Sequence, residues 1–499
     1  MSASHPDPTG NLRRIEGLVK SPAGLRRIRV LLLSSGSFLL MLLVFLAGCS
    51  SNQGSAASPT SPTGPGGGGG AGGGGGSGGG GGSGGGGGTG GGGGTGGSGG
   101  SGGGGGTGSG GGSGSGGSGT TVAAYVYVAE RTSNTSPNQI VAYAANANGQ
   151  LTPVSGSPFK DNVGPMATNG TYLMGAAQSP GTNPTKTTAY INAYKIGSDG
   201  SLTLAAQTNL DKFGSGCVDG GTPQFDRTGK SLYVLEDNFD CTGVGDAGNS
   251  GMASFTVDSA TGNLTYLGVV DLGRFGGIIN GTGRIDFTSN DLYAYGPSND
   301  SCMYYSTYGF VRSGNGMLNL ISNFTPQSTP TSSAFRIYIP LLSAADSANH
   351  LAIAEAPANP PGCSTPIQLA TYTAGANGEL TTTDTYATMP KTSISSPYDM
   401  KISPSGTLLA IAGQEGLQVF HFNGDKPIMT YTGLLTTDPI QAIAWDNQNH
   451  LYAITSPDLS GSANANKLYV FTVTDTTATQ ATGSPYSIEI PYNLAVQAK

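Results

Sequence analysis

Three acidic residues recur at one position of an internal repeat in this chain. Glu130, Glu236 and Glu355 each follow a short apolar segment directly, and Arg131 and Asp237 adjoin two of them. If the fold brings these carboxylates together at the mouth of a channel, they could coordinate a cation or accept hydrogen bonds from a sugar-like ligand. If the fold keeps them apart, they would be ordinary acidic side chains in solvent-exposed loops. The pattern leaves both interpretations open.

A second set of charged residues falls on the segments expected, from the repeat described below, to form inner strands. Its members are Arg284, Asp286, Arg336, Asp399 and Lys401. Because successive residues of a strand point to opposite sides, some of them would line a channel. Others would form salt bridges between neighbouring repeats. These residues are therefore candidate channel groups.

Histidine and metal chemistry have little support in the sequence. Of the four histidines, His5 lies in the leader, His350 and His450 precede apolar segments, and His421 lies within one. None is placed as a catalytic base. No CxxC motif or Cys/His cluster occurs, so zinc is not expected. The acidic loop 237–249 offers oxygen ligands without EF-hand spacing, which leaves Ca²⁺ as the one candidate cofactor.

The elements that must position these residues form a repeat of about four strands every 40–57 residues. Its second strand is apolar and often contains tyrosine. The copies begin at Tyr125, Leu232, Leu292, Leu351, Leu408 and Leu451. A Gly-x-Leu hairpin, often preceded by Asn or Asp, joins the third and fourth strands, with its glycine at positions 149, 200, 262, 316 and 378. Four-stranded units at this spacing predict an all-β propeller.

Counting the units predicts seven blades. Six complete units start near Val163, Val218, Ile278, Ala334, Ser396 and Pro439. The first segment, 122–159, begins at a second strand and lacks an inner one. The last segment, 491–496, has the form of an inner strand with nothing after it. Pairing these two ends would complete blade one and close the ring, which removes exposed sheet edges.

The composition divides the chain into three parts. The chain has 87 glycines in 499 residues, and 43 of them lie between positions 61 and 120. Residues 49–120 form a Gly/Ser-rich segment without apolar surface, which predicts a disordered tether that would span about 45 Å on average. The predicted parts are residues 1–48 as signal peptide, 49–120 as linker and 121–499 as propeller.

Charge is also unevenly distributed. The formal charge is −7 overall and +4 over residues 1–48, while residues 49–120 carry none, which leaves −11 for residues 121–499. An acidic domain repels phosphate backbones, so nucleic acid is not an expected partner. We expect a monomer.

The leader has a basic start, an apolar run over residues 30–46 and small residues before Cys49. This arrangement is typical of a secretory signal, through either the general or the twin-arginine route. Leu46-Ala-Gly-Cys49 resembles the bacterial lipobox, which implies cleavage before Cys49 and a lipid (diacylglycerol with fatty acyl chains such as palmitate) on that residue. Ser50 rather than Asp in the next position favours the outer membrane or periplasmic side of the cell envelope.

The remaining cysteines are Cys217, Cys241, Cys302 and Cys363. An even number in an exported protein predicts two disulfide bonds, with three connectivities. All four are expected on the propeller face that carries the loops between second and third strands. Their positions in the repeat favour the pairs Cys217–Cys241 and Cys302–Cys363.

Two stretches of the repeat resemble a known family. Asn148-Gly-Gln-Leu-Thr-Pro-Val-Ser-Gly-Ser-Pro-Phe159, echoed by Gly483-Ser-Pro-Tyr486, and Ser396-Pro-Tyr-Asp-Met-Lys-Ile-Ser-Pro-Ser-Gly406 look like the lactonase-type seven-bladed propellers. That family includes the 6-phosphogluconolactonases and the fungal muconate cycloisomerases. The resemblance covers residues 121–499 and implies the propeller fold. Its motifs belong to the scaffold, so they assign no catalytic residue.

Two functions follow as hypotheses. The first is a membrane-tethered binding or scaffold module for a glycan, a cation or a protein. The second, suggested by the resemblance, is a lactonase that hydrolyses a sugar-acid lactone. Export and the few histidines favour the binding module, because the familiar acid–base machinery is missing.

Overall fold

The computed structural model describes the part of the chain from residue 121 onward, with gaps. The described residues are 121–133, 135–180, 187–210, 217–220, 222–239, 247–273, 284–288, 291–300, 304–321, 330, 337–358, 366–459 and 466–499. The described residues form β-strands, and no α-helix is assigned among them. They belong to one compact unit, Gly110–Lys499.

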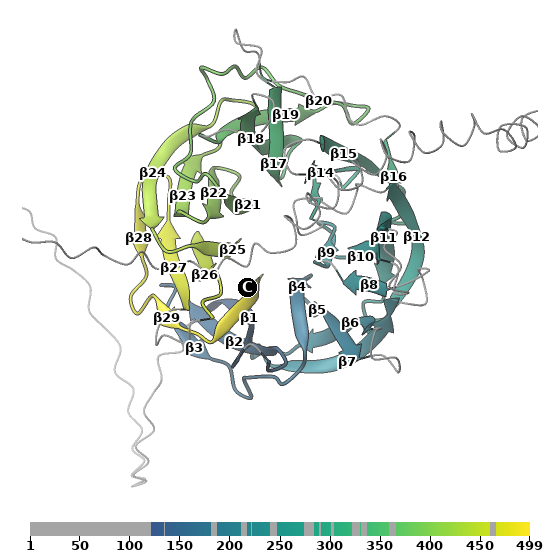
Figure 1. Ribbon diagram of the computed structural model, residues 1–499. Coiled ribbons are helices and arrows are strands. Elements are labelled where there is room, and N and C mark those ends of the chain that lie inside the picture. Colours follow the sequence, from purple (N-terminus) through teal and green to yellow (C-terminus); the bar gives the residue numbers. More distant parts are fainter. Residues whose placement is uncertain are drawn as a thin grey trace, which may run out of the picture. The chain divides into compact units, whose positions relative to one another are not determined.

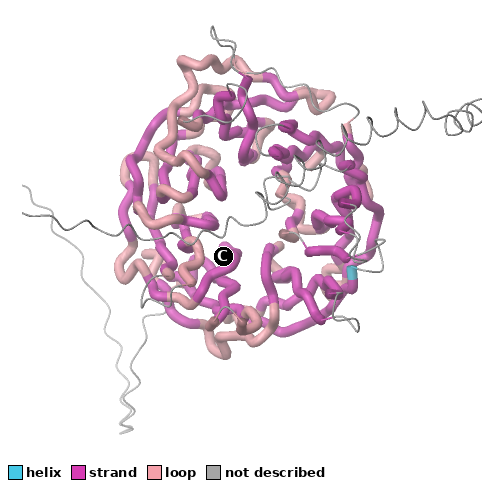
Figure 2. The backbone as a smooth tube through the Cα atoms, viewed as in Figure 1, coloured by secondary structure: helices cyan, strands magenta, loops and turns pink. Residues whose placement is uncertain are grey.

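The strands form seven antiparallel sheets arranged around a ring, as predicted (Figures 1 and 2). Blade 1 contains β1 (Val122–Arg131), β2 (Gln139–Asn146), β3 (Leu151–Pro153) and β30 (Ile490–Ala498). Blade 2 contains β4 (Val163–Thr168), β5 (Tyr172–Pro180), β6 (Thr187–Ile196) and β7 (Leu202–Asn209). Blade 3 contains β8 (Cys217–Gly220), β9 (Gln224–Phe225), β10 (Ser231–Phe239), β11 (Ala247–Val257) and β12 (Leu264–Gly273).

The remaining four blades follow the same plan. Blade 4 contains β13 (Asp286–Phe287), β14 (Tyr293–Asp300), β15 (Tyr304–Arg312) and β16 (Leu318–Leu320). Blade 5 contains β17 (Ile337–Ala345), β18 (His350–Ala358), β19 (Gln368–Ala374) and β20 (Leu380–Thr381). Blade 6 contains β21 (Pro397–Ile402), β22 (Leu408–Gly413), β23 (Gly416–His421) and β24 (Met429–Thr436). Blade 7 contains β25 (Ile440–Trp445), β26 (His450–Thr455), β27 (Lys467–Val473), β28 (Ala478–Gln480) and β29 (Tyr486–Ser487).

The last strand closes the ring. β30 pairs antiparallel with β1, with Val126 opposite Val496 and Val128 opposite Leu494. The sheet order of blade 1 is β3-β2-β1-β30, so the C-terminal strand takes the inner position that the N-terminal segment lacks. This closure is the one that the sequence predicts.

The hydrophobic core lies between the blades. Each of the seven clusters of buried apolar side chains joins two adjacent blades, and the series includes one between blades 7 and 1. In that last cluster, Val126 and Val128 of β1 pack with Tyr452 and Leu468 of blade 7. Every blade therefore buries apolar surface on two sides, which leaves the inner strands, β4, β17, β21 and β25 among them, around the centre (Figure 1).

Candidate functional site

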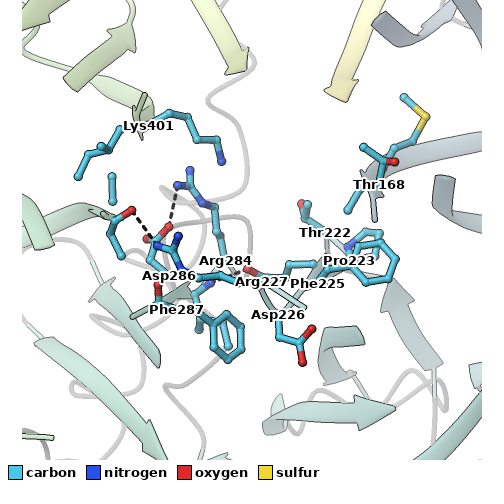
Figure 3. Close-up of a pocket in the computed structure, with 17 residues that line it drawn as sticks. Thr168, Thr222, Pro223, Phe225, Asp226, Arg227, Arg284, Asp286, Phe287 and Lys401 are labelled. Carbon is cyan, nitrogen blue, oxygen red and sulfur yellow. Dashed lines mark hydrogen bonds and ion pairs between the residues drawn. The ribbon is translucent and has the colours of Figure 1, made fainter. Parts of the chain in front are cut away.

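A pocket of about 390 Å³ lies where the ends of five inner strands converge (Figure 3). These strands are β4, β9, β13, β17 and β21, from blades 2 to 6. The lining includes the polar side chains of Thr168, Thr222, Gln224, Asp226, Arg227, Arg284, Asp286 and Lys401. The pocket lies near the turns that connect first to second strands, because it is lined by the C-terminal residues of inner strands and by the turn residues Asp226 and Arg227.

Arg284 holds two inner strands together beside this pocket. Its Nη2 lies 2.8 Å from Oδ1 of Asp286, on the same blade, and its Nη1 lies 2.6 Å from Oδ1 of Asp399, on blade 6. Nη2 also donates to the carbonyl oxygen of Met400 at 2.9 Å. The charged side chains are mostly buried, with Arg284 16% and Asp399 13% exposed. The sequence left two roles open for the inner-strand charges, channel lining and salt bridges between blades. Arg284 has both, since it lines the pocket and bridges blades 4 and 6.

The carboxylates around the pocket are already engaged by protein donors. The hydroxyl of Ser343 donates to Oδ2 of Asp286 at 2.6 Å, and the amide of Ile443 donates to Oδ2 of Asp399 at 2.9 Å. Asp226 accepts from Arg312 at 2.7 Å and from the hydroxyl of Thr228 at 2.9 Å. These acids therefore offer little free coordination to an incoming cation.

Lys401 is the basic group of the pocket with the weakest protein partner. Among the described residues, its Nζ makes one ion pair, at 3.7 Å from Oδ1 of Asp399. The side chain is 33% exposed. Partial burial, together with the positive charge of Arg284, lowers the pKa of Lys401 to about 8. Lys401 is thus a donor that lacks a close acceptor.

Arg227 stands in the turn after β9 and ties blades 3, 4 and 5 together. Its Nε donates to the carbonyl oxygen of Phe287 at 3.0 Å, and its Nη2 donates to the carbonyl oxygens of Ala345 and Asp346. The guanidinium adds positive charge to the pocket while its hydrogen bonds fix the wall. Asp226 and Arg227 were not among the residues predicted for the site, although the Asp-x-x-Gly turn at 226–229 marks the place where an inner strand ends.

The glutamates predicted at the mouth do not line this pocket. Glu130 and Glu355 stand within β1 and β18 and are buried, with 3% and 1% of their surface exposed. They are not solvated loop acids, because both strands continue beyond them and pair on both sides. Glu355 pairs with Pro340 near the start of β17, whereas the pocket contacts Ala344 and Ala345 at its end. The intervening strand length is about 15 Å, so the two sets of candidates lie toward opposite ends of the channel.

The other candidates are placed in part. Arg131 ends β1 and is partly exposed, with a buried Nε that has no hydrogen-bond partner. Glu236 and Asp237 belong to β10 through their backbone pairing with Gly220 and Asp219. Positions outside the described residues are Cys49, Arg336, Cys241, Cys302, Cys363 and most of the loop 237–249; Cys217 is described only as part of β8. The two predicted disulfide bonds therefore fall outside the described part.

The histidines of the propeller take up structural positions. Nδ1 of His350 lies 2.8 Å from Oδ2 of Asp346, and Nδ1 of His450 lies 2.7 Å from Oδ2 of Asp446. His421 ends β23, and its ring centroid lies 4.3 Å from that of Tyr431. None of the three lines the pocket.

No helix among the described residues is long and apolar enough to span a bilayer. No group of three or more His, Cys, Asp or Glu side chains in the described ranges is arranged to hold a metal ion.

Comparison with known proteins finds similarity in structure only. No protein-family model and no curated protein matches the sequence. Among solved structures, a proposed 6-phosphogluconolactonase from Bacteroides uniformis is 12% identical, with a TM-score of 0.49 over 75% of this chain and 100% of that one. The periplasmic gluconolactonase of Pseudomonas aeruginosa is 14% identical, with a TM-score of 0.37 over 75% and 98% of the two chains.

A third solved structure, a protein of unknown function from Desulfotomaculum acetoxidans, is 10% identical, with a TM-score of 0.45 over 75% and 98% of the two chains. The structural neighbours thus include 6-phosphogluconolactonase-like propellers, at low sequence identity. Likeness at this level concerns the fold alone.

Proposed function

We propose that the propeller is a binding module whose channel pocket takes a small anionic molecule rich in hydroxyl groups, such as a sugar acid. The observation that carries this proposal is the state of Lys401. Its ammonium group reaches the pocket with one long ion pair, while the neighbouring carboxylates are engaged by closer donors. A pocket whose lysine ammonium group has no close partner among the described residues favours a ligand that brings a hydrogen-bond acceptor.

The surroundings favour a carboxylate over the other ligand classes. Arg284 and Arg227 add positive charge beside Lys401, and Thr168 and Thr222 are the hydroxyl residues of the lining (Figure 3). A cation would face three basic side chains and acids that already have partners, so the pocket suits it poorly. A volume of about 390 Å³ suits a ligand of monosaccharide size.

The test is direct binding of gluconate to the full-length protein by calorimetry. We expect binding that Lys401→Met weakens by about tenfold or more, since a charged hydrogen bond is worth roughly 1.5–3 kcal/mol. Lys401→Arg is the matched control, because it keeps the charge and should retain most of the affinity. Equal affinity of gluconate for wild type and Lys401→Met, or selective binding of neutral sugars, would refute the proposal.

Hydrolysis of a sugar-acid lactone is the alternative function, and one observation favours it. With its pKa lowered to about 8, Lys401 is partly a neutral amine near neutral pH, and a neutral amine can accept a proton from an attacking water. The positive charge of Arg284 would stabilise the developing oxyanion. The assay is gluconolactone hydrolysis by the full-length protein. Turnover that rises through pH 8 and disappears in Lys401→Met would support this function over simple binding.

We propose further that the chain is exported and anchored through a lipid on Cys49, with residues 50–120 as a tether. The support is the leader sequence, its lipobox-like Leu46-Ala-Gly-Cys49 and the Gly-rich composition that follows. Labelled palmitate should enter the wild-type chain in bacterial cells and should not enter Cys49→Ala. Equal labelling of both chains would place the lipid elsewhere.

A further inference from the structure

Two residues paired across blade 5 each carry a buried oxygen atom without a donor. Glu355 lies directly opposite Gln368 in the pairing of β18 with β19. Oε2 of Glu355 and Oε1 of Gln368 are both buried, and neither has a hydrogen-bond partner. Side chains directly opposite each other in an antiparallel pair have Cβ atoms about 5 Å apart, which is within reach for their end groups. Two unpaired acceptors side by side in the interior would be costly.

The orientation of the Gln368 amide is determined by its surroundings. Its Nε2 donates to the carbonyl oxygens of Tyr386 and Met389, at 3.1 and 3.0 Å. Rotating the amide by half a turn would set its oxygen against these two carbonyls, so the amide oxygen must stay on the side of Glu355. A protonated carboxyl group on Glu355 would supply a donor for the Gln368 oxygen and would itself need no further donor at Oε2.

Blade 1 contains the same glutamate, glutamine and tyrosine, but there the glutamine donates to the glutamate. Glu130 lies opposite Gln139, but here Nε2 of Gln139 donates to Oε1 of Glu130 at 3.3 Å. The backbone amide of Glu489 donates to its Oε2 at 3.1 Å. A tyrosine follows the glutamine by four residues in both blades, at Tyr143 and Tyr372. Glu130 thus receives two hydrogen bonds, which favour its ionised form and oppose the burial that raises its pKa.

We infer that Glu355 is a protonated carboxylic acid that donates from Oε2 to the amide oxygen of Gln368, and that losing this proton loosens blade 5. In the protonated state Oε1 accepts from the hydroxyl of Tyr372 at 2.9 Å, so each polar atom of the pair has a partner. Ionisation would set a carboxylate against an amide oxygen in the interior, at the end of the β18–β19 pairing.

Among the described residues, the groups around Glu355 do not supply a positive charge. β19 contributes Gln368 and Tyr372, and β17 contributes Pro340 opposite Glu355, with the buried Tyr338 nearby in the sequence. Blade 4 contributes Tyr295 to the same cluster as Tyr338 and Tyr372. Lys391 pairs with Gln368 through its backbone but is exposed, and Asp384 accepts from the amide of Thr371. Burial is accordingly the main cause that raises the pKa of Glu355, to about 7.

The raised pKa of Glu355 determines how the stability of the fold depends on pH. Below the pKa of an unfolded glutamate, about 4.5, the group is neutral in both states and the fold keeps its full stability. As pH rises from there to about 7, the unfolded chain releases the proton and the folded chain retains it, so stability falls. Above about 7 the loss is complete. The unfolding equilibrium constant should increase by a factor on the order of 10² over this window.

The experiment is urea unfolding of the full-length protein between pH 4.5 and 9, with Glu355→Gln and Glu130→Gln as matched variants. Glutamine at 355 can donate to Gln368 and still accept from Tyr372, so Glu355→Gln should lack this pH dependence and exceed wild type at pH 8. Glu130→Gln should retain the part that Glu355 contributes and lose only its own, because burial raises the pKa of Glu130 in the same direction. Parallel curves for wild type and Glu355→Gln, or a Glu355→Gln variant weaker at every pH, would overturn the inference.

A second measurement serves if a variant fails to fold. Infrared spectra of wild type at pH 6 should show the carbonyl stretch of a protonated carboxyl group, a state that exposed carboxylates have left by then. Absence of this band would contradict the protonated state. A bound cation between the two oxygens is an alternative explanation, and Ca²⁺ that raises the unfolding midpoint of wild type but not of Glu355→Gln would establish it instead.

Discussion

At the scale of single residues, the environment decides which chemistry a residue type can perform. Glu130 and Glu355 occupy the same repeat position, yet one receives two donors and the other faces an acceptor. Lys401 and Arg284 both line the pocket, but Arg284 is held at close distance by Asp286, Asp399 and the carbonyl oxygen of Met400. The group with remaining capacity is Lys401, and for this reason the proposed ligand site is built around it.

The pH dependence of ligand binding should follow the ionisation of Lys401. Its pKa is lowered to about 8 in the free protein, and an anion in the pocket would raise it by stabilising the ammonium form. Affinity for gluconate should therefore be constant below pH 7 and should decrease by up to tenfold per pH unit above about 8. Calorimetric titrations at several pH values measure this. An affinity that increases with pH would contradict a cationic Lys401 in the bound state.

At the scale of elements, a tyrosine and a glycine from adjacent blades form a recurring bond. The hydroxyls of Tyr127, Tyr233 and Tyr295, on second strands, donate to the carbonyl oxygens of glycines in the hairpin of the next blade, at 3.1, 2.8 and 3.0 Å. The acceptors are Gly200, Gly316 and Gly378. The tyrosines and the hairpin glycines are both visible in the sequence as repeats. Their contact joins neighbouring blades, because the hydroxyl satisfies a backbone oxygen of the adjacent sheet.

Substituting the hairpin glycine of blade 2 should disrupt this junction. Gly200 has a φ of +84°, and a Cβ there would collide with the ring of Tyr125. Gly406 has a similar φ of +74° but no atom within 4 Å of a Cβ. Gly406→Ala should cost about 1 kcal/mol for the left-handed backbone alone, and Gly200→Ala about 1–3 kcal/mol more for overpacking. Urea unfolding of the two variants measures the difference, and equal losses would show that the blade junction tolerates the added methyl group.

At the scale of the whole molecule, the two ends of the propeller sequence form one sheet. β30 covers the edge of β1, and its residues Leu494 and Ala495 contribute to the cores between blades 7 and 1 and between blades 1 and 2. The pocket draws on five strands, from β4 to β21, that together span more than two hundred residues of sequence. Closure of the ring by β30 sets the core at both junctions of blade 1.

Deleting residues 491–499 should destabilise the propeller cooperatively. The deletion exposes the backbone edge of β1 and the buried Val126 and Val128. We expect a single unfolding transition at a much lower temperature, or aggregation, by scanning calorimetry. A chain shortened within the Gly-rich segment 66–106 is the control and should unfold as wild type does. A deletion variant with the wild-type transition would mean that β30 is dispensable for the ring.

The sequence by itself determined the fold class, the number of blades and the way in which the ring closes. These features depend on local patterns, such as the Asn-Gly and Asp-Gly turns and the apolar second strands, that recur in most of the blades. It also nominated Arg284, Asp286, Asp399 and Lys401 as inner-strand charges. Only the tertiary structure decided which of them face one another, that Arg227 joins them, and that Glu130 and Glu355 are buried. Burial and pairing depend on contacts between blades distant in sequence, and no local pattern records those contacts.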